Sequence, residues 1–249
     1  MGILKTITKE YFGDTVRKED MINLNSLNVE IISFTDNNKK YHGIGYKPKD
    51  KDNLKMLLKR MIEMRGDEGY FNDIDTSDIE DMSSLFKNNK NFNGDITGWD
   101  VSNVKYMNDM FFYSTSFNQP IGNWNVSKVE NMNCMFSDAT SFNQPIGKWD
   151  VSNVYNMKYM FFGCHKFNQP IGNWKVSKVT TMEYMFAYVT SFNQPIENWD
   201  VSNVTNMSNM FNYAKSFNQD LSKWDLTEKE TIGMFNDCPI KDEYKPKMK

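Results

Sequence analysis

Residues 116–129 read SFNQPIGNWNVSKV, and this stretch recurs almost unchanged every 25 residues along the chain. Its phenylalanine returns at the same spacing, at Phe92, Phe117, Phe142, Phe167, Phe192 and Phe217. Its tryptophan does the same, so that all six tryptophans share one repeat position, at Trp99, Trp124, Trp149, Trp174, Trp199 and Trp224. A fixed period of about 20–50 residues is typical of stacked supersecondary units, none of which can bury its apolar face alone.

This period predicts an α/β repeat solenoid. Six units begin near Ile74, Trp99, Trp124, Trp149, Trp174 and Trp199, and a partial seventh begins at Trp224. We therefore assign residues 74–223 to six solenoid repeats. Residues 224–249 are expected to form a partial repeat, a cap and a charged tail, because terminal units of such arrays become polar to end the stack.

Valine, methionine and phenylalanine each recur at fixed repeat positions. The motif Val-x-x-Val-x-x-Met-x-x-Met-Phe runs from Val101 to Phe111 and returns in the following units. A methionine-rich stripe suits an adaptable binding groove. However, the same residue type at the same position in every unit is what an interior stack requires, so we expect a core. A spacing of three fits a 3₁₀ or short helical turn and also a bent strand, so the segment that forms a parallel ladder is left open.

Asparagine is equally regular, at Asn93, Asn118, Asn143, Asn168, Asn193 and Asn218. Repeated asparagine in stacked units predicts side-chain amides that bond along the stack or to turn carbonyls. A sugar-binding row is the weaker alternative.

The first 73 residues lack the repeat. Residues 26–46 have the composition of a β-hairpin, within a lead-in that we bound at residues 1–49. Residues 52–65 carry an amphipathic stripe of Leu54, Leu57, Leu58, Met61 and Ile62. Asp50 or Asp52 can cap this helix at its start and Gly66 at its end. We expect residues 50–73 to form an N-terminal capping helix and linker that shield the first repeat.

Composition excludes several classes of partner. The net charge is only −3, so no basic surplus indicates a nucleic acid, and no apolar run is long enough to span a membrane. The three cysteines have neither metal-like nor redox-like spacing, and we expect no cofactor and no metal. The first residues lack the apolar core of a signal peptide. We expect a surface or secreted location if a leader was removed, and a cytoplasmic location otherwise.

The segment WDVSNVTNMSNMF, residues 199–211, is followed by Phe217-Asn218-Gln219 and resembles the BspA-like leucine-rich repeats. The resemblance is to the 25-residue subgroup found in mycoplasma surface lipoproteins, and it covers residues 47–237. It implies a right-handed, leucine-rich-repeat-like coil and, for most members, surface display with adhesion or host-protein binding. It brings no catalytic residues.

The repeat positions that vary are rich in aromatic side chains, which we interpret as candidates for one outward interaction strip: Tyr106, Phe112, Tyr113, Tyr155, Tyr159, Phe162, Tyr184, Tyr188 and Tyr213. Tyrosine is favoured in interfaces because it buries a large area at low entropy cost. The alternative is ordinary packing against neighbouring units.

The expected function is non-enzymatic protein binding of the adhesion or host-interaction type. The alternatives are an intracellular regulator, such as an immunity or inhibitor protein, and a glycan-binding module. An enzyme is the least favoured class, because two isolated histidines and no glycine-rich phosphate loop leave no catalytic set to assemble.

Overall fold

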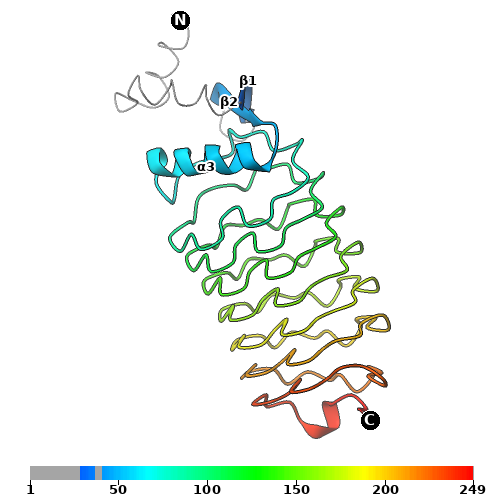
Figure 1. The fold of residues 1–249 in the computed structure, drawn as a ribbon. Helices are drawn as coiled ribbons and strands as arrows, with labels where there is room; N and C mark the ends of the chain where they lie inside the picture. Colours follow the sequence, from blue (N-terminus) through cyan, green and yellow to red (C-terminus); the bar gives the residue numbers. More distant parts are fainter. Residues whose placement is uncertain (1–28, 37–40, 249) are drawn as a thin grey trace, which may run out of the picture.

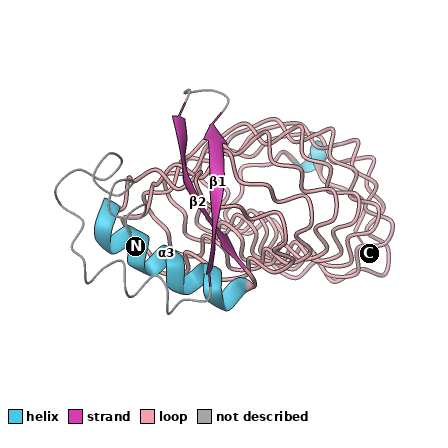
Figure 2. Cartoon of the chain, turned by 90° about the horizontal axis from the view of Figure 1, so that it is seen from above, coloured by secondary structure: helices cyan, strands magenta, loops and turns pink. Residues whose placement is uncertain are grey.

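The structure, a computed structural model, describes residues 29–36 and 41–248. Its regular elements are the strands β1 (Val29–Asp36) and β2 (Tyr41–Pro48), the helix α3 (Lys51–Arg65) and a 3₁₀ helix, η2 (Asp242–Tyr244). From α3 to η2 the chain winds through successive coils, in which the described residues form turns and isolated parallel bridges (Figure 1; Figure 2).

The hairpin expected over residues 26–46 is present, because β1 and β2 pair antiparallel with Val29 opposite Pro48. Residues 1–28 of the predicted lead-in and residues 37–40 of the predicted turn lie outside the described residues. β2 also bonds to the first coil: the Tyr46 N–H donates to the Asp73 carbonyl (2.8 Å), and the Asp75 N–H donates to the Tyr46 carbonyl (2.9 Å).

Helix α3 begins and ends where its capping residues lie. The Asp50 carboxylate accepts the Asn53 N–H at 2.8 Å, and Gly66, at φ 79°, donates its N–H to the Ile62 carbonyl. Four side chains of the stripe are no more than 2 % exposed and join the core of the coils, namely Leu54, Leu57, Leu58 and Met61. Arg65 anchors the end of the helix through two hydrogen bonds, of 2.7 and 2.8 Å, to the Asp73 carboxylate. The helix therefore lies across the end of the array (Figure 1).

The coils are joined by a backbone ladder over residues 105–113 and their equivalents. Met107, Asp109, Phe111 and Tyr113 donate their N–H groups to carbonyls of the next coil at 2.8–3.0 Å. The residues between them donate within the coil instead, as Met110 does to the Met107 carbonyl. Every second residue thus bonds along the stack, and the others close consecutive β-turns.

This alternation requires positive φ at two positions of each coil. Asp109 and Tyr113 both have φ 57°, and their equivalents in the following coils have φ between 54° and 66°. They are third residues of turns closed by i to i+3 hydrogen bonds, a position where a type II turn requires positive φ. The ladder is therefore built neither from a regular strand nor from a 3₁₀ helix.

Away from the ladder, asparagine side chains carry the bonds between coils. The Asn93 Oδ1 accepts the Asn118 N–H (2.9 Å), the Asn118 Oδ1 accepts the Asn143 N–H (3.0 Å), and the relay continues through Asn168, Asn193 and Asn218 to the Lys241 N–H. The predicted bonding of amides along the stack is thus confirmed, with backbone N–H groups as the donors.

Tryptophan occupies one buried edge, where each indole is 3–4 % exposed. Four of the six indole N–H groups donate to carbonyls of the preceding coil, as Trp149 does to Ile121 (3.2 Å) and Trp199 does to Ile171 (3.1 Å), whereas the indole nitrogens of Trp124 and Trp224 have no hydrogen-bond partner among the described residues.

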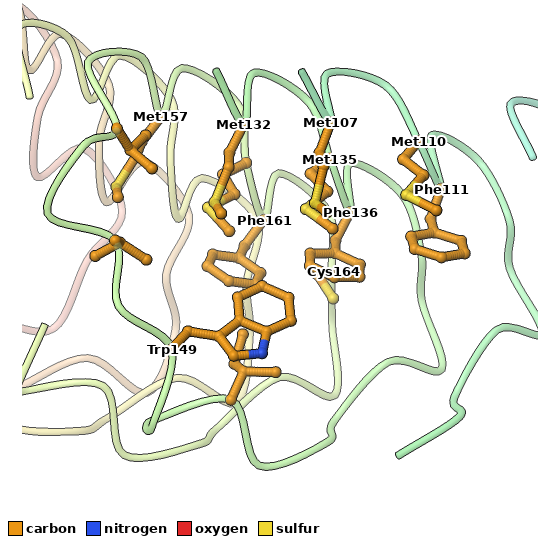
Figure 3. Close-up of a cluster of buried hydrophobic side chains, with 14 of the residues drawn as sticks. Met107, Met110, Phe111, Met132, Met135, Phe136, Trp149, Met157, Phe161 and Cys164 are labelled. Carbon is orange, nitrogen blue, oxygen red and sulfur yellow. The ribbon is translucent and has the colours of Figure 1, made fainter. Parts of the chain in front are cut away.

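Aromatic rings in the core stack from coil to coil with their planes nearly parallel (Figure 3). The ring centroids of Phe161 and Phe186 are 5.7 Å apart, those of Phe167 and Phe192 are 6.0 Å apart, and those of Trp174 and Trp199 are 6.3 Å apart. On the outer side of the ladder the spacing is only 4.7 Å, between Tyr159 and Tyr184. The spacing therefore widens from the ladder to the tryptophan edge, which indicates that the stack bends toward the ladder.

The last residues take the place of a further coil. The Leu221 N–H donates to the Tyr244 carbonyl at 2.8 Å, Asp225 bridges to Lys247, and Ile240 is 5 % exposed.

The assignment of these coils to the leucine-rich-repeat class and their right-handed winding stay predictions.

Gly147 lies directly against the backbone of the next coil. A Cβ on Gly147 would lie 2.3 Å from the Pro170 carbonyl oxygen, so we expect Gly147→Ala to lower the free energy of unfolding by about 1–3 kcal/mol. Glu197 occupies the same repeat position and already carries a Cβ, so Glu197→Ala is the matched control, with an expected change within about 0.5 kcal/mol. Urea unfolding followed by circular dichroism measures both; equal midpoints would contradict this account.

The asparagine relay makes a second prediction. Asn143→Leu removes the acceptor of the Asn168 N–H and should cost about 1–3 kcal/mol in unfolding free energy. Asn143→Asp keeps an oxygen at the same place and should retain most of the stability. If the leucine variant unfolds at the wild-type urea concentration, the relay is not stabilising the stack.

Candidate functional site

Side chains of the ladder segment are buried and exposed in pairs. Met107, Met110, Phe111 and Ser114 are fully buried, whereas positions 108, 109, 112 and 113 are wholly or partly exposed. We define the ladder face as these four positions and their equivalents in the other coils. Residue types vary from coil to coil on this face, so it is where the array can carry specificity.

Five of the predicted strip residues meet on the ladder face and form what we call the aromatic cluster: Tyr159, Phe162, Tyr184, Tyr188 and Tyr213. Tyr159 stacks on Tyr184 (4.7 Å, 5° between planes), and Tyr188 stacks on Tyr213 (5.0 Å, 6°). Phe162 joins the two stacks edge-on, at 5.5 Å from Tyr159 and 5.4 Å from Tyr188. The cluster is thus one continuous aromatic surface over three coils.

The other four predicted residues lie apart from the cluster. Phe112 and Tyr113 occupy the same repeat positions nearer the N-terminus, where Lys87 lies 4.9 Å from the Phe112 ring and Lys90 lies 4.8 Å from the Tyr113 ring. The next coils place Asp138 and Gly163 in line with Tyr113, so its row of rings is interrupted.

Tyr106 and Tyr155 belong to repeat positions that precede the ladder face. Tyr106 forms the parallel bridges to Asp81 and Asn131, and Tyr155 lines a separate groove. The ring contacts therefore join five of the nine residues, and Tyr106 and Tyr155 are not among them.

Four tyrosines of the cluster lie in the left-handed region of backbone space: Tyr159 and Tyr184 at φ 55°, Tyr188 at 61° and Tyr213 at 56°. Glycine, asparagine and aspartate tolerate this conformation best. Gly163, Asn209 and Asp138 hold the same repeat positions in other coils. That mixture of small turn residues with tyrosine was the sequence signal for positive φ, and the sequence analysis missed it.

Charged side chains border the cluster. Lys158 forms a 2.6 Å ion pair with Glu183 and lies 5.4 Å from the Tyr159 ring, and Lys215 lies 4.5 Å from the Tyr213 ring. The Asp237 carboxylate raises the pKa of Tyr213, and burial, with Glu183 nearby, raises that of Tyr159. Both phenols are therefore neutral at physiological pH, and the cluster can bind as an amphipathic surface with hydroxyl groups at its edge.

Cys134 shares the repeat position of Tyr159 and Tyr184. Burial, with Asp109 nearby, raises the pKa of its thiol to about 11, and burial also raises the pKa of Cys164, which is fully buried. Both thiols are protonated at neutral pH and are therefore poor nucleophiles.

A second surface lies at repeat positions 103 and 105, which sequence reasoning did not single out. It is a groove of ≈ 740 Å³ that we call the lysine groove, lined by Lys105, Lys128, Asn153, Tyr155, Lys178 and Asn203, together with Glu130 and Thr180.

Comparison with protein families identifies what kind of chain carries these surfaces. The family described as "Mycoplasma protein of unknown function, DUF285" matches residues 54–169 and again residues 141–245. The chain belongs to the DUF285 family. The matched ranges of DUF285 run from within α3 to the residues just after η2, and so include the aromatic cluster and the lysine groove. Searches of curated proteins and of solved structures gave no match.

Over residues 29–36 and 41–248, no three His, Cys, Asp or Glu side chains gather closely enough to hold a metal ion. Over the same residues, no helix has both the length and the apolar character needed to cross a bilayer.

The positive φ at Tyr188 predicts that a glycine substitution is less destabilising than an alanine substitution. Tyr188→Gly and Tyr188→Ala both lose the contacts with Phe162 and Tyr213, but only alanine retains the cost of positive φ. We expect the glycine variant to be more stable than the alanine variant by about 1 kcal/mol, the reverse of the usual order in regular structure. Thermal unfolding of the two proteins measures this, and an alanine variant at least as stable as the glycine variant would refute the positive φ.

Proposed function

We propose that this DUF285 chain is a non-enzymatic protein-binding module, a BspA-like, leucine-rich-repeat-type solenoid that presents the aromatic cluster to a protein partner. The expected role is adhesion or host interaction. The observation that carries the proposal is the placement of four tyrosines at positive φ on one exposed face.

The free-energy cost of positive φ at these tyrosines supports a role for their side chains outside folding. A residue with a Cβ in the left-handed region costs roughly 1–2 kcal/mol. A stacked aromatic pair contributes only about 0.5–1.5 kcal/mol beyond its buried area, and that gain is shared between two tyrosines. The stacking contribution alone therefore does not exceed the backbone cost of placing tyrosine at these positions. The tyrosine side chains are better explained by what they contact outside the chain.

The cluster also has the properties of an interface centre. Rings that already stack at 4.7 and 5.0 Å lose little further freedom on binding, which reduces the entropy cost of association. Lys158 and Glu183 at its edge supply the charged rim that typically surrounds aromatic hot spots.

The test begins with a photo-reactive phenylalanine analogue in place of Tyr213 in the full chain. Proteins crosslinked from source cells and from host-cell surfaces are identified by mass spectrometry, and the same analogue at the exposed Lys148 gives the background. A partner enriched only at Tyr213 is then purified for binding measurements.

With that purified partner, Tyr184→Asn combined with Tyr188→Gly should weaken binding by at least about 2 kcal/mol, roughly thirtyfold in Kd. These replacements copy residues that the chain already uses at the same positions, so the melting temperature should change little. Lys148→Ser is the control and should bind as wild type. Equal Kd values for the double variant and wild type would overturn the proposal.

A further inference from the structure

The lysine groove has a regular charge pattern. Lys128 and Lys178 share one repeat position and lie two coils apart, a separation of about 10 Å at the usual strand spacing. Asn153, at the same position in the coil between them, is uncharged. At this repeat position the groove therefore presents one ammonium group on every second coil, while Lys105, in the coil before Lys128, is already paired with Glu80 at 2.8 Å.

Both ammonium groups are held in place. The Lys128 Nζ donates to the Asn103 Oδ1 and the Lys178 Nζ donates to the Asn153 Oδ1, each at 2.7 Å. Asn153 is itself fixed by the 2.7 Å hydrogen bond from its Nδ2 to the Ser127 carbonyl. An ammonium group has three donors, so each lysine keeps capacity for an anionic ligand while its position is set in advance.

Tyr155 lies in the coil between the two lysines, and its side chain is 43 % exposed. Its neighbours in the row are Glu130 and Thr180, so no ring in the adjacent coils stacks on it. An exposed aromatic face beside hydrogen-bonding groups suits a ligand with an apolar C–H face and polar edges.

The backbone N–H groups in the row of Tyr155 are already used between coils. Glu130 donates its N–H to the Lys105 carbonyl (2.8 Å), Tyr155 donates to Glu130 (2.9 Å), and Thr180 donates to Tyr155 (2.9 Å). An added peptide strand depends on free main-chain partners. This row therefore offers no free N–H group to an added strand, which favours a ligand recognised by side chains.

We propose that the lysine groove binds a linear acidic oligosaccharide whose β-linked pyranose rings carry a carboxylate on every second sugar. One pyranose advances such a chain by about the spacing of one coil, so successive carboxylates meet Lys128 and Lys178. The sugar between them stacks on Tyr155, and the Glu130 carboxylate accepts hydrogen bonds from its hydroxyl groups. This site is separate from the aromatic cluster and independent of the protein-binding proposal.

The probe is a hyaluronan octasaccharide, in which uronate alternates with a neutral sugar, titrated calorimetrically into the full chain. We expect saturable binding that Lys128→Gln and Lys178→Gln each weaken roughly tenfold, as expected for loss of a charge-assisted hydrogen bond. Tyr155→Thr copies the residue type of Thr180 and Thr205 at the same position and should also weaken binding, by roughly fivefold to tenfold. Melting temperatures confirm that each variant folds.

Two controls separate this site from nonspecific charge and from the cluster. Lys223→Gln removes an exposed lysine outside the groove and should bind as wild type, and so should Tyr184→Asn. The carboxyl-reduced octasaccharide should bind at least tenfold more weakly.

Three results would overturn the proposal. One is no saturable binding of the octasaccharide at millimolar concentration. The second is binding that the Lys128, Tyr155 and Lys178 variants leave unchanged. The third is a poly-glutamate peptide that binds more tightly than the octasaccharide and loses its affinity in the same lysine variants, which would assign the groove to acidic peptides.

Discussion

The whole structure depends on one constraint: each coil must bond its buried N–H and C=O groups to the coils on either side. Three donor–acceptor arrangements meet this requirement around one coil. On the ladder, backbone N–H groups donate directly to backbone carbonyls of the next coil. At Asn118 and its equivalents, the side-chain oxygen accepts a backbone N–H of the next coil. At the tryptophan edge, an indole N–H donates to a carbonyl of the preceding coil, as in Trp149. Ring spacing grows in the same order, from 4.7 Å between the outer tyrosines to 6.3 Å between tryptophans. The bend of the stack and the identity of its repeated polar residues thus have one cause.

The same constraint explains which parts of the fold could be predicted from sequence. An environment that recurs in every coil requires the same residue in every coil, so the period, the core positions and the asparagine relay could be derived from repetition alone. Helix α3 could be derived from its own stripe and caps, since its stop at Gly66 is a local signal. The ladder could not be located, because consecutive turns with left-handed residues at Asp109 and Tyr113 produce neither the period of a strand nor that of a helix. Only glycine, asparagine and aspartate at the positions of Asp109 and Tyr113 indicated it.

The surfaces were harder to predict than the core for a related reason. Five of the nine predicted aromatic residues do meet, because their repeat positions fall on the ladder face and their coils are adjacent. Tyr106 and Tyr155 are only a few residues from that face in sequence, yet their rings do not contact the cluster. The lysine groove could not be recognised in the sequence, because Lys128 and Lys178 resemble ordinary solvated lysines there. Only the structure shows that an asparagine of the preceding coil holds each of them. Surface sites in such a stack depend on contacts between coils, which residue type alone does not encode.

Interior and surface also repeat with different periods. The valine, methionine and phenylalanine positions repeat with every coil, whereas the groove alternates asparagine (Asn103, Asn153, Asn203) with lysine (Lys128, Lys178). Each lysine requires the asparagine oxygen of the preceding coil, so lysine in adjacent coils would remove that acceptor and place two ammonium groups side by side. Phe162 follows the same rule on the ladder face, since its ring leans toward Tyr184 and Tyr188 of the next coil, where Ala187 holds the position equivalent to its own. At these two positions the surface therefore repeats over a pair of coils, and a partner that contacts them must match a spacing that packing between coils sets.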